Sequence, residues 1–200
     1  MPQFDLRGIY AATYVNTNGT ISYTGPQKFG DAMNVQLELR FAEGRLYAES
    51  TLAEYMRKAV GGTISIGVKY IPTAAQQLLF GSRSKSRSVS YTPSTGTTST
   101  SAAVSSLVIG GKTTSKYVGV AFYAPDMVDG VEKFTCVKIA RALFGPPSMT
   151  LQTAGENIVF NTPTTSGEFL ADDSVNQDLI EVAICDDENE AIAWVQAVLA

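Results

Sequence analysis

The stretch Met33–Phe41 has the sequence MNVQLELRF, in which apolar and polar residues alternate at every position. Neighbouring side chains of a β-strand point to opposite faces of its sheet, so this period of two predicts a half-buried strand. A second stretch, Thr63–Ile71, is rich in β-branched residues and predicts another strand. Together the two stretches indicate a β domain.

Strand and turn signals continue on both sides of these stretches. Ile9–Val15 predicts a strand that turns back at Asn18-Gly19, because this pair accepts the positive φ angles of a tight hairpin. Leu52–Val60 has a helix-forming composition, yet Gly61-Gly62 could close a hairpin there, and a strand is preferred. Further strands are expected at Tyr117–Tyr123, Val131–Val137, Ile158–Phe160, Gly167–Leu170 and Leu179–Cys185, with a turn at Pro125–Gly130. Ile139–Phe144 is expected either to continue the strand Val131–Val137 or to pair with it.

Two helices are expected among the strands. The central one is Thr73–Phe80, which follows a proline, has Thr73 as its cap and ends at Gly81. The last one is Asp187–Leu199, capped by Asp186 and acidic in its first turn. Its apolar stripe is formed by Ile192, Val195, Val198 and Leu199. The chain is therefore expected to be one antiparallel β domain, residues 1–200, with a central and a C-terminal helix.

The composition excludes several classes of site. The chain has no histidine, which removes Ser-His and Cys-His catalytic pairs and imidazole metal ligands. Cys136 and Cys185 are too few for a disulfide framework or a four-cysteine zinc site, and we expect buried, inert thiols. No apolar run approaches the length that spans a bilayer. No enzyme activity, cofactor, metal site or membrane partner is predicted.

The charge is divided unevenly along the chain. Residues 1–148 hold all 15 Lys and Arg and nine of the acids, whereas residues 149–200 hold ten acids and no base. The basic residues of the Ser/Thr-rich segment 82–116 are Arg83, Lys85, Arg87, Lys112 and Lys116. We expect this segment to be a long loop or a mobile arm with one strand near Val104–Ile109. The division suggests either oppositely charged regions that meet head to tail in an assembly or two unrelated solvated surfaces.

An ordered series of weak motifs covers nearly the whole chain. Its members are Tyr10–Ala12, Asn18-Gly19, Thr24–Pro26, Phe29–Ala32, Gly61–Gly67, Pro72–Gly81, Tyr117–Phe122, Asp129-Gly130, Phe134–Phe144, Thr150–Thr153, Ile158–Pro163, Gly167 and Ala193–Val195. This series resembles the major tail proteins of long-tailed, non-contractile phages, which are tail-tube subunits. The segment 92–106 departs most from that family.

The resemblance implies a β-sandwich or open β-barrel with a flanking helix and no catalytic residue or cofactor. In that family six subunits join their sheets into a ring, and the rings stack into a tube through which DNA passes without specific binding. The implied partners are further copies of the chain, a tape-measure protein, a tail-tip initiator and a tail terminator. The implied location is the virion tail, after synthesis in the host bacterial cytoplasm.

Three groups of residues are expected to form contacts between subunits. The resemblance assigns the segment Phe41–Ala53 to contact with the neighbouring ring, with Phe41, Glu43, Arg45, Tyr47 and Glu49 as candidates. The charge division suggests that the five basic residues of 82–116 face an acidic surface, 172–190, on another subunit. Its candidates are Asp172, Asp173, Asp186 and Asp187.

A monomeric β-sandwich that binds carbohydrate or a cell surface is the alternative function. It would be expected to display a platform of aromatic side chains, and the single tryptophan, Trp194, lies in an expected helix. An enzyme that works through paired carboxylates is a weaker alternative, because no pair of acids stands out by its spacing.

Overall fold

The computed structural model describes residues 5–48, 51–96, 98–128, 130–148 and 162–200. The fold is mainly β, with 63% of these described residues in strands and 10% in helices. The elements are β1 (Arg7–Thr17), β2 (Thr20–Lys28), β3 (Ala32–Ala48), β4 (Thr51–Val68), α1 (Thr73–Phe80), β5 (Arg83–Tyr91), β6 (Thr100–Val108), β7 (Val118–Val128), β8 (Val131–Phe144), β9 (Thr164–Leu170), β10 (Ile180–Cys185) and α2 (Glu188–Ala197). The prediction of an antiparallel β fold with one central and one C-terminal helix is confirmed.

One antiparallel sheet forms the body, in the order β2-β1-β7-β8-β9-β4-β3. The long strand β8 pairs with β7 on one side, and on its other side with β10 near Cys136 and with β9 near Ala142. Strands β2 and β3 therefore end the sheet, and among the described residues neither has a partner on its outer edge.

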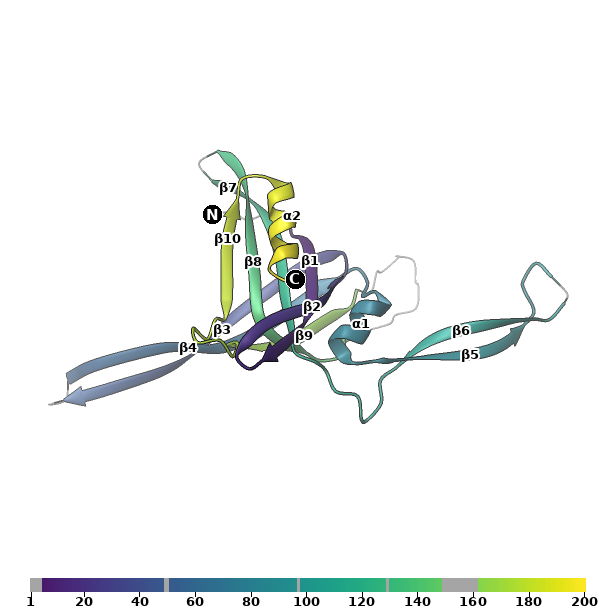
Figure 1. The fold of residues 1–200 in the computed structure, drawn as a ribbon, viewed down its shortest axis with the longest axis horizontal. Helices are drawn as coiled ribbons and strands as arrows, with labels where there is room; N and C mark the ends of the chain where they lie inside the picture. Colours follow the sequence, from purple (N-terminus) through teal and green to yellow (C-terminus); the bar gives the residue numbers. More distant parts are fainter. Residues whose placement is uncertain (1–4, 49–50, 97, 129, 149–161) are drawn as a thin grey trace, which may run out of the picture.

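The sheet separates two apolar cores because alternate residues of its strands face opposite ways. Val120 and Phe122 of β7 point into the inner core, whereas Ala121 and Tyr123 point into the outer core beneath α2. The inner core includes residues of β1, β4, β8, β9 and α1 and of the turn between β2 and β3: Ile9, Phe29, Ile64, Ile66, Leu79, Ile139, Phe144 and Phe169. The sheet thus curls around its inner face, like a sandwich or an open barrel, with α2 on its outside (Figure 1).

Two predictions that depend only on the backbone conformation of neighbouring residues are confirmed, the first hairpin turn and the end of α1. Asn18 and Gly19 have φ angles of 52° and 86° and join β1 to β2 as a tight hairpin. Gly81 ends α1 in the left-handed conformation, with a φ of 63°. The predicted turn at Pro125–Gly130 is too long, because Pro125 and Asp126 stay in the ladder with β8 and Val128 already pairs with Val131.

The interpretation of Gly61-Gly62 as a turn is wrong. Both glycines lie inside the continuous strand β4, where Gly62 pairs with β3 and β9 at once. A β-carbon on Gly62 would overlap the Glu38 carbonyl oxygen and the Phe169 ring, so the glycine is required by close packing. Next to it, Arg40 pairs with Gly61 but Phe41 pairs with Ala59, which leaves one extra residue and forms a β-bulge.

Two helix caps differ from the prediction. The cap position of α1 is Pro72, so Thr73 is already inside the helix and no side chain caps it. At α2 the cap is Asp187 instead of Asp186, and its side chain accepts a hydrogen bond from the Asn189 backbone at 2.7 Å. Segment Ile158–Phe160 lies outside the described residues. Among those described, no helix has the length and hydropathy needed to cross a bilayer.

Two β ribbons leave the body in opposite directions along the long axis of the molecule (Figure 1). One is the far part of the β3–β4 hairpin, residues 41–59, which begins at the bulge; we call it the β3–β4 arm. The other is the separate two-stranded sheet of β5 and β6, residues 83–108, which we call the β5–β6 arm. The segment predicted as a loop or mobile arm is therefore largely a regular hairpin, and the segment Phe41–Ala53 is the end of another.

Candidate functional site

One face of the β3–β4 arm is held in shape by a row of charged and aromatic side chains. The guanidinium of Arg57 lies 3.7 Å from the centre of the Phe41 ring. Glu43 forms ion pairs with Arg57 and with Arg45, which in turn lies over the Tyr55 ring. All of these side chains are partly or fully exposed, so the ion pairs add little stability and mainly order the surface.

The same arm exposes large apolar side chains on both faces. On the face opposite Glu43, Leu46 is 58% exposed and Met56 is 75% exposed. Nearer the tip Tyr47 pairs with Leu52, and both are exposed by more than half. A ribbon of two strands has no third layer to cover such residues, so their apolar surface stays in water in the monomer.

Of the contact candidates in this segment, the structure brings three together. Phe41, Glu43 and Arg45 form part of the row on one face, and Tyr47 follows them toward the tip. Glu49 lies outside the described residues. The exposed partners on β4, above all Met56, were missed because Leu52–Val60 gave an ambiguous secondary-structure signal; their pairing with the alternating strand was the missing information.

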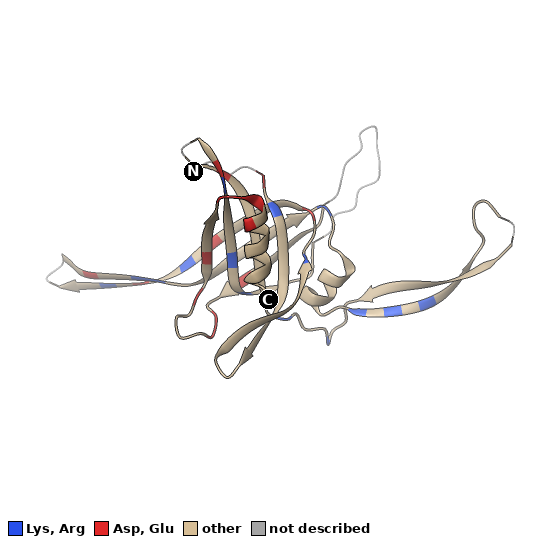
Figure 2. Cartoon of the chain, turned by 45° about the horizontal axis from the view of Figure 1, so that its top comes forward, with Lys and Arg blue, Asp and Glu red and all other residues tan. Residues whose placement is uncertain are grey.

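The β5–β6 arm has two chemically different faces, fixed by its register. Lys85 pairs with Ser106 and Arg87 with Val104, so each pair shares one face. The basic face carries Arg83, Lys85, Arg87, Val89 and Tyr91 from β5, and the serine face carries Ser84, Ser86, Ser88 and Ser90. Every residue of β5 is exposed, and Figure 2 shows the basic residues in a row along it.

The loop after β6 brings the other two basic candidates to the root of this arm. Lys112 and Lys116 are exposed there. The loop is closed by hydrogen bonds between Gly110 and Thr113, in which each backbone N–H finds an acceptor on the other residue. The root of the arm therefore carries two further positive charges.

The acids of 172–190 fall into two groups with different roles. Asp172 accepts hydrogen bonds from Ser174 and from the Asp178 backbone, and so closes the loop between β9 and β10. Asp173 bonds to Arg141 at 2.7 Å and to Tyr14 and Asn16 at 3.0 Å each. These bonds hold the pKa of Asp173 below its usual value, with those from Asn16 and Tyr14 as the largest causes. Asp172 and Asp173 thus serve the fold of their own chain.

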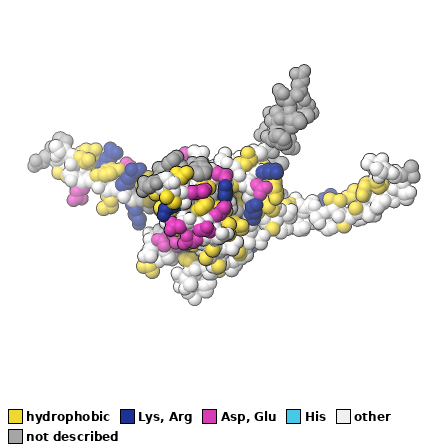
Figure 3. Space-filling model, turned by 90° about the horizontal axis from the view of Figure 1, so that it is seen from above, with side chains coloured by type: hydrophobic (Ala, Val, Ile, Leu, Met, Phe, Trp, Pro, Cys, Tyr) yellow, Lys and Arg dark blue, Asp and Glu magenta, His cyan; other side chains and the backbone are white. Residues whose placement is uncertain are grey.

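The second group lies on β10 and the first turn of α2, and we call it the acidic surface. Its members are Glu181, Asp186, Asp187, Glu188 and Glu190. Asp186 pairs with Lys133, and Glu188 pairs with Arg7 and accepts a hydrogen bond from Tyr123. Acidic side chains gather on the body in Figure 3, and the β5–β6 arm has none. Structure and sequence together therefore separate a basic arm from an acidic body.

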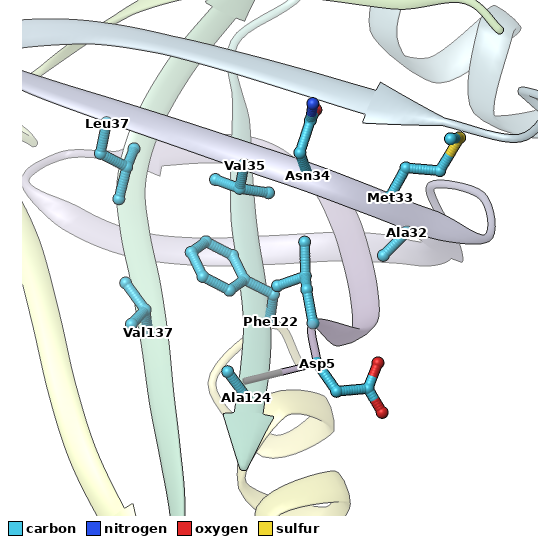
Figure 4. Close-up of a pocket in the computed structure, with 10 residues that line it drawn as sticks. Asp5, Ala32, Met33, Asn34, Val35, Leu37, Phe122, Ala124 and Val137 are labelled. Atoms are coloured by element: carbon cyan, nitrogen blue, oxygen red, sulfur yellow. The ribbon is translucent and has the colours of Figure 1, made fainter. Parts of the chain in front are cut away.

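A groove that the sequence did not reveal opens where β3 crosses β7 and β8 (Figure 4). Val35 and Leu37 of β3 face Phe122 and Val137 across it, and its volume is about 480 Å³. The polar groups at its rim are Asp5 and Asn34. Most of the side chains that line the groove are apolar, and the groove adjoins the unpaired edge of β3. In the described part of the chain no three His, Cys, Asp or Glu side chains are placed to hold a metal.

The two cysteines lie side by side beneath α2. Cys136 and Cys185 are buried and free, and their sulfur atoms are 3.7 Å apart. Burial, and then the neighbouring thiol, raise the pKa of Cys136 to about 12. The prediction that both cysteines are buried is confirmed.

No protein-family profile matches the chain, and a search of curated proteins finds no match. What the chain does is therefore inferred from its residues and its geometry.

Proposed function

We propose that the chain is a structural virion protein that assembles into stacked rings, which form the tail tube of a long-tailed, non-contractile phage. The observation that carries this proposal is the pair of arms that leave the body in opposite directions. A soluble monomer gains nothing from holding Leu46 and Met56 on a ribbon in water. A stacked polymer covers such residues with the neighbouring ring.

The ends of the sheet support closure of a ring. Strands β2 and β3 present unpaired outer edges in the described structure, and they are at opposite ends of one strand order. Edge strands of this kind readily pair with another chain. If the β2 edge of one copy joined the β3 edge of the next, one sheet would continue from subunit to subunit, and six copies would match the family the sequence resembles. Contacts between unlike surfaces of this type either close into a ring or run on as a filament.

The proposed partners follow from the proposed family. The subunit would polymerise from a tail-tip initiator around a tape-measure protein, and a terminator would end the tube. DNA would cross the lumen without specific binding, which suits a chain with a net charge of −4. The proposed location is the virion tail, after synthesis in the host cytoplasm.

Electron microscopy of the purified protein over a concentration series tests the proposal, with and without preformed assemblies as seeds. Rings or tubes are the expected result. A protein that stays monomeric at every concentration, and that binds a glycan on a glycan array, would replace the proposal with the binding-module alternative.

A further inference from the structure

The basic face of the β5–β6 arm is electrostatically incomplete in a single chain. Nine ion pairs link side chains of the described residues, and none of them includes Arg83, Lys85 or Arg87. Alternate residues of a strand are about 7 Å apart, so the three charges repel one another along β5. The strand has no acid, and none occurs between Glu54 and Asp126.

The arm is also incomplete as a folded unit. A two-stranded hairpin is at best marginally stable in water. Among the described residues β5 and β6 pair with no other strand, and every residue of β5 is exposed. The β5 residues of the serine face are all serines, whereas those of the basic face include Val89 and Tyr91, which are 43% and 49% exposed. Both its charges and its apolar groups therefore favour a second surface against the basic face.

The acidic surface has the matching chemistry. Glu181 uses Oε2 for Lys138, and Asp186 uses Oδ1 for Lys133, so each keeps a second carboxylate oxygen as an acceptor. Both side chains are mostly exposed, at 53% and 79%. Val182 and Ile184 of β10 are also exposed, but they alternate with Glu181 and so lie on the opposite face of the strand, whose outer edge has no partner in the described structure. The acidic surface can thus accept cations, and the unpaired edge of β10 beside it can accept a second chain.

We infer that the basic face of the β5–β6 arm docks on the acidic surface of a second copy of this chain. A second copy is required because the arm projects away from its own body, on the side opposite β10 (Figure 1). Each copy then gives one arm and receives one, so the contact repeats from subunit to subunit. The inference deepens the proposed function, and it assigns the contact to Glu181 and Asp186. Asp172 is partly buried and holds its own loop closed, and both carboxylate oxygens of Asp173 are bound within the chain.

A pair of charge-reversed variants tests the inference. Variant one carries Arg83→Glu, Lys85→Glu and Arg87→Glu, and variant two carries Glu181→Lys and Asp186→Lys. Each alone places like charges at the contact, so self-association measured by sedimentation velocity should weaken at least tenfold. An equimolar mixture restores opposite charges at every contact, so it should associate again in alternating order. Zero-length carbodiimide cross-linking should join Lys85 to Glu181 between wild-type copies, even where only dimers form.

A matched control shows whether association depends on the charges of the basic face or only on the net charge of the protein. Arg83→Gln, Lys85→Gln and Arg87→Gln remove three positive charges, and Ser84→Glu, Ser86→Glu and Ser90→Glu add three negative charges on the serine face. The net charge changes equally, and only the first set should weaken association at least tenfold. Equal weakening by both sets, or no recovery in the mixture, would overturn the inference.

The remaining outcomes distinguish a failure of the docking from a failure of the proposed function. Wild-type tubes with no effect of variant one would reject the docking and leave the proposed function standing. Cross-linked dimers without rings or tubes at any concentration would reject the proposed function and keep the docking. Binding of a DNA oligonucleotide that variant one abolishes, with no cross-link between copies, would replace the second copy by nucleic acid.

Discussion

Arg141 is the residue that ties the acidic loop to the body. Its guanidinium pairs with Asp173 at 2.7 Å and lies 4.1 Å from the centre of the Tyr117 ring. It also lies over Tyr14, whose hydroxyl bonds to the same carboxylate. A planar guanidinium can stack and form an ion pair at once, which a lysine cannot do equally well. The contact joins β1, β8 and the loop before β10, so it is structural.

The first prediction concerns this carboxylate at low pH. The pKa of Asp173 is lowered in the folded chain, so its contribution to stability is present above the unfolded pKa, near 3.9, and is lost as the pH falls through the folded pKa. Asp173→Asn should therefore lower the free energy of unfolding at pH 7 and flatten its fall between pH 5 and pH 2. Urea unfolding at several pH values measures this. Asp178→Asn is the control, and an equally flattened curve for it would contradict the assignment.

The second prediction concerns the buried thiols at high pH. The pKa of Cys136 is raised to about 12, so the thiol stabilises the fold fully below the unfolded pKa, near 8.5, and this stabilisation is lost as the pH rises toward 12. The absorbance of the Cys136 thiolate should appear well above pH 10 in the native protein and near pH 8.5 in urea. Native thiols should also resist an aromatic disulfide reagent at pH 8. Rapid labelling of the folded protein at that pH would show that the site is open.

Among the elements, β4 shows which signals are local and which are not. The Asn18-Gly19 turn was predictable because its two φ angles are a property of those residues. The Gly61-Gly62 pair looked equally like a turn. Glycine is required at Gly62, however, because a side chain there would overlap Phe169, which is more than 100 positions away in the sequence. No local pattern contains that contact, so a continuous strand was divided in two.

The third prediction tests this reason for Gly62. Gly62→Ala places a methyl group against the Glu38 carbonyl and the Phe169 ring, and should destabilise the body by at least about 2 kcal/mol. Gly44→Ala is the matched control, because Gly44 lies in β3 on the arm with open space around it. It should change the free energy of unfolding by less than about 0.5 kcal/mol in either direction. Similar values for the two variants in denaturant unfolding would show that Gly62 is not held by packing.

The alternation of MNVQLELRF predicted its strand correctly, but it did not predict which part of the strand is buried by other elements. Val35 and Leu37 are partly buried, whereas Leu39 and Phe41 on the same face are 45% and 40% exposed. The pattern shows which side of a strand is apolar, and it does not show where the body ends and the arm begins. That boundary lies at the bulge beside Gly61, where β9 stops pairing with β4.

At the scale of the whole molecule, the charge division was countable from the sequence, but its geometry was not. The serines and bases of 82–116 predicted a loop or mobile arm with one strand, but not the regular pairing of β5 with β6. The separation of Asp173 from Asp186 required the fold, because Arg141 and Tyr14 approach the first carboxylate from other strands. Net charge over a segment says nothing about which acids already have partners.

The fourth prediction separates folding from assembly in the β3–β4 arm. Replacing residues 42–58 by Asn-Gly joins Phe41 to Ala59, which already pair, and removes no residue of the inner or outer core. The shortened chain should fold as a monomer with a melting temperature within about 5 °C of the full chain, since the exposed arm stabilises little. It should form no tubes, because the apolar residues of the arm can no longer be covered by a neighbour. Circular dichroism measures folding of the body, and electron microscopy measures tube formation. Tubes from the shortened chain would show that the arm is dispensable for stacking, and loss of the folded body would show that the arm belongs to the core.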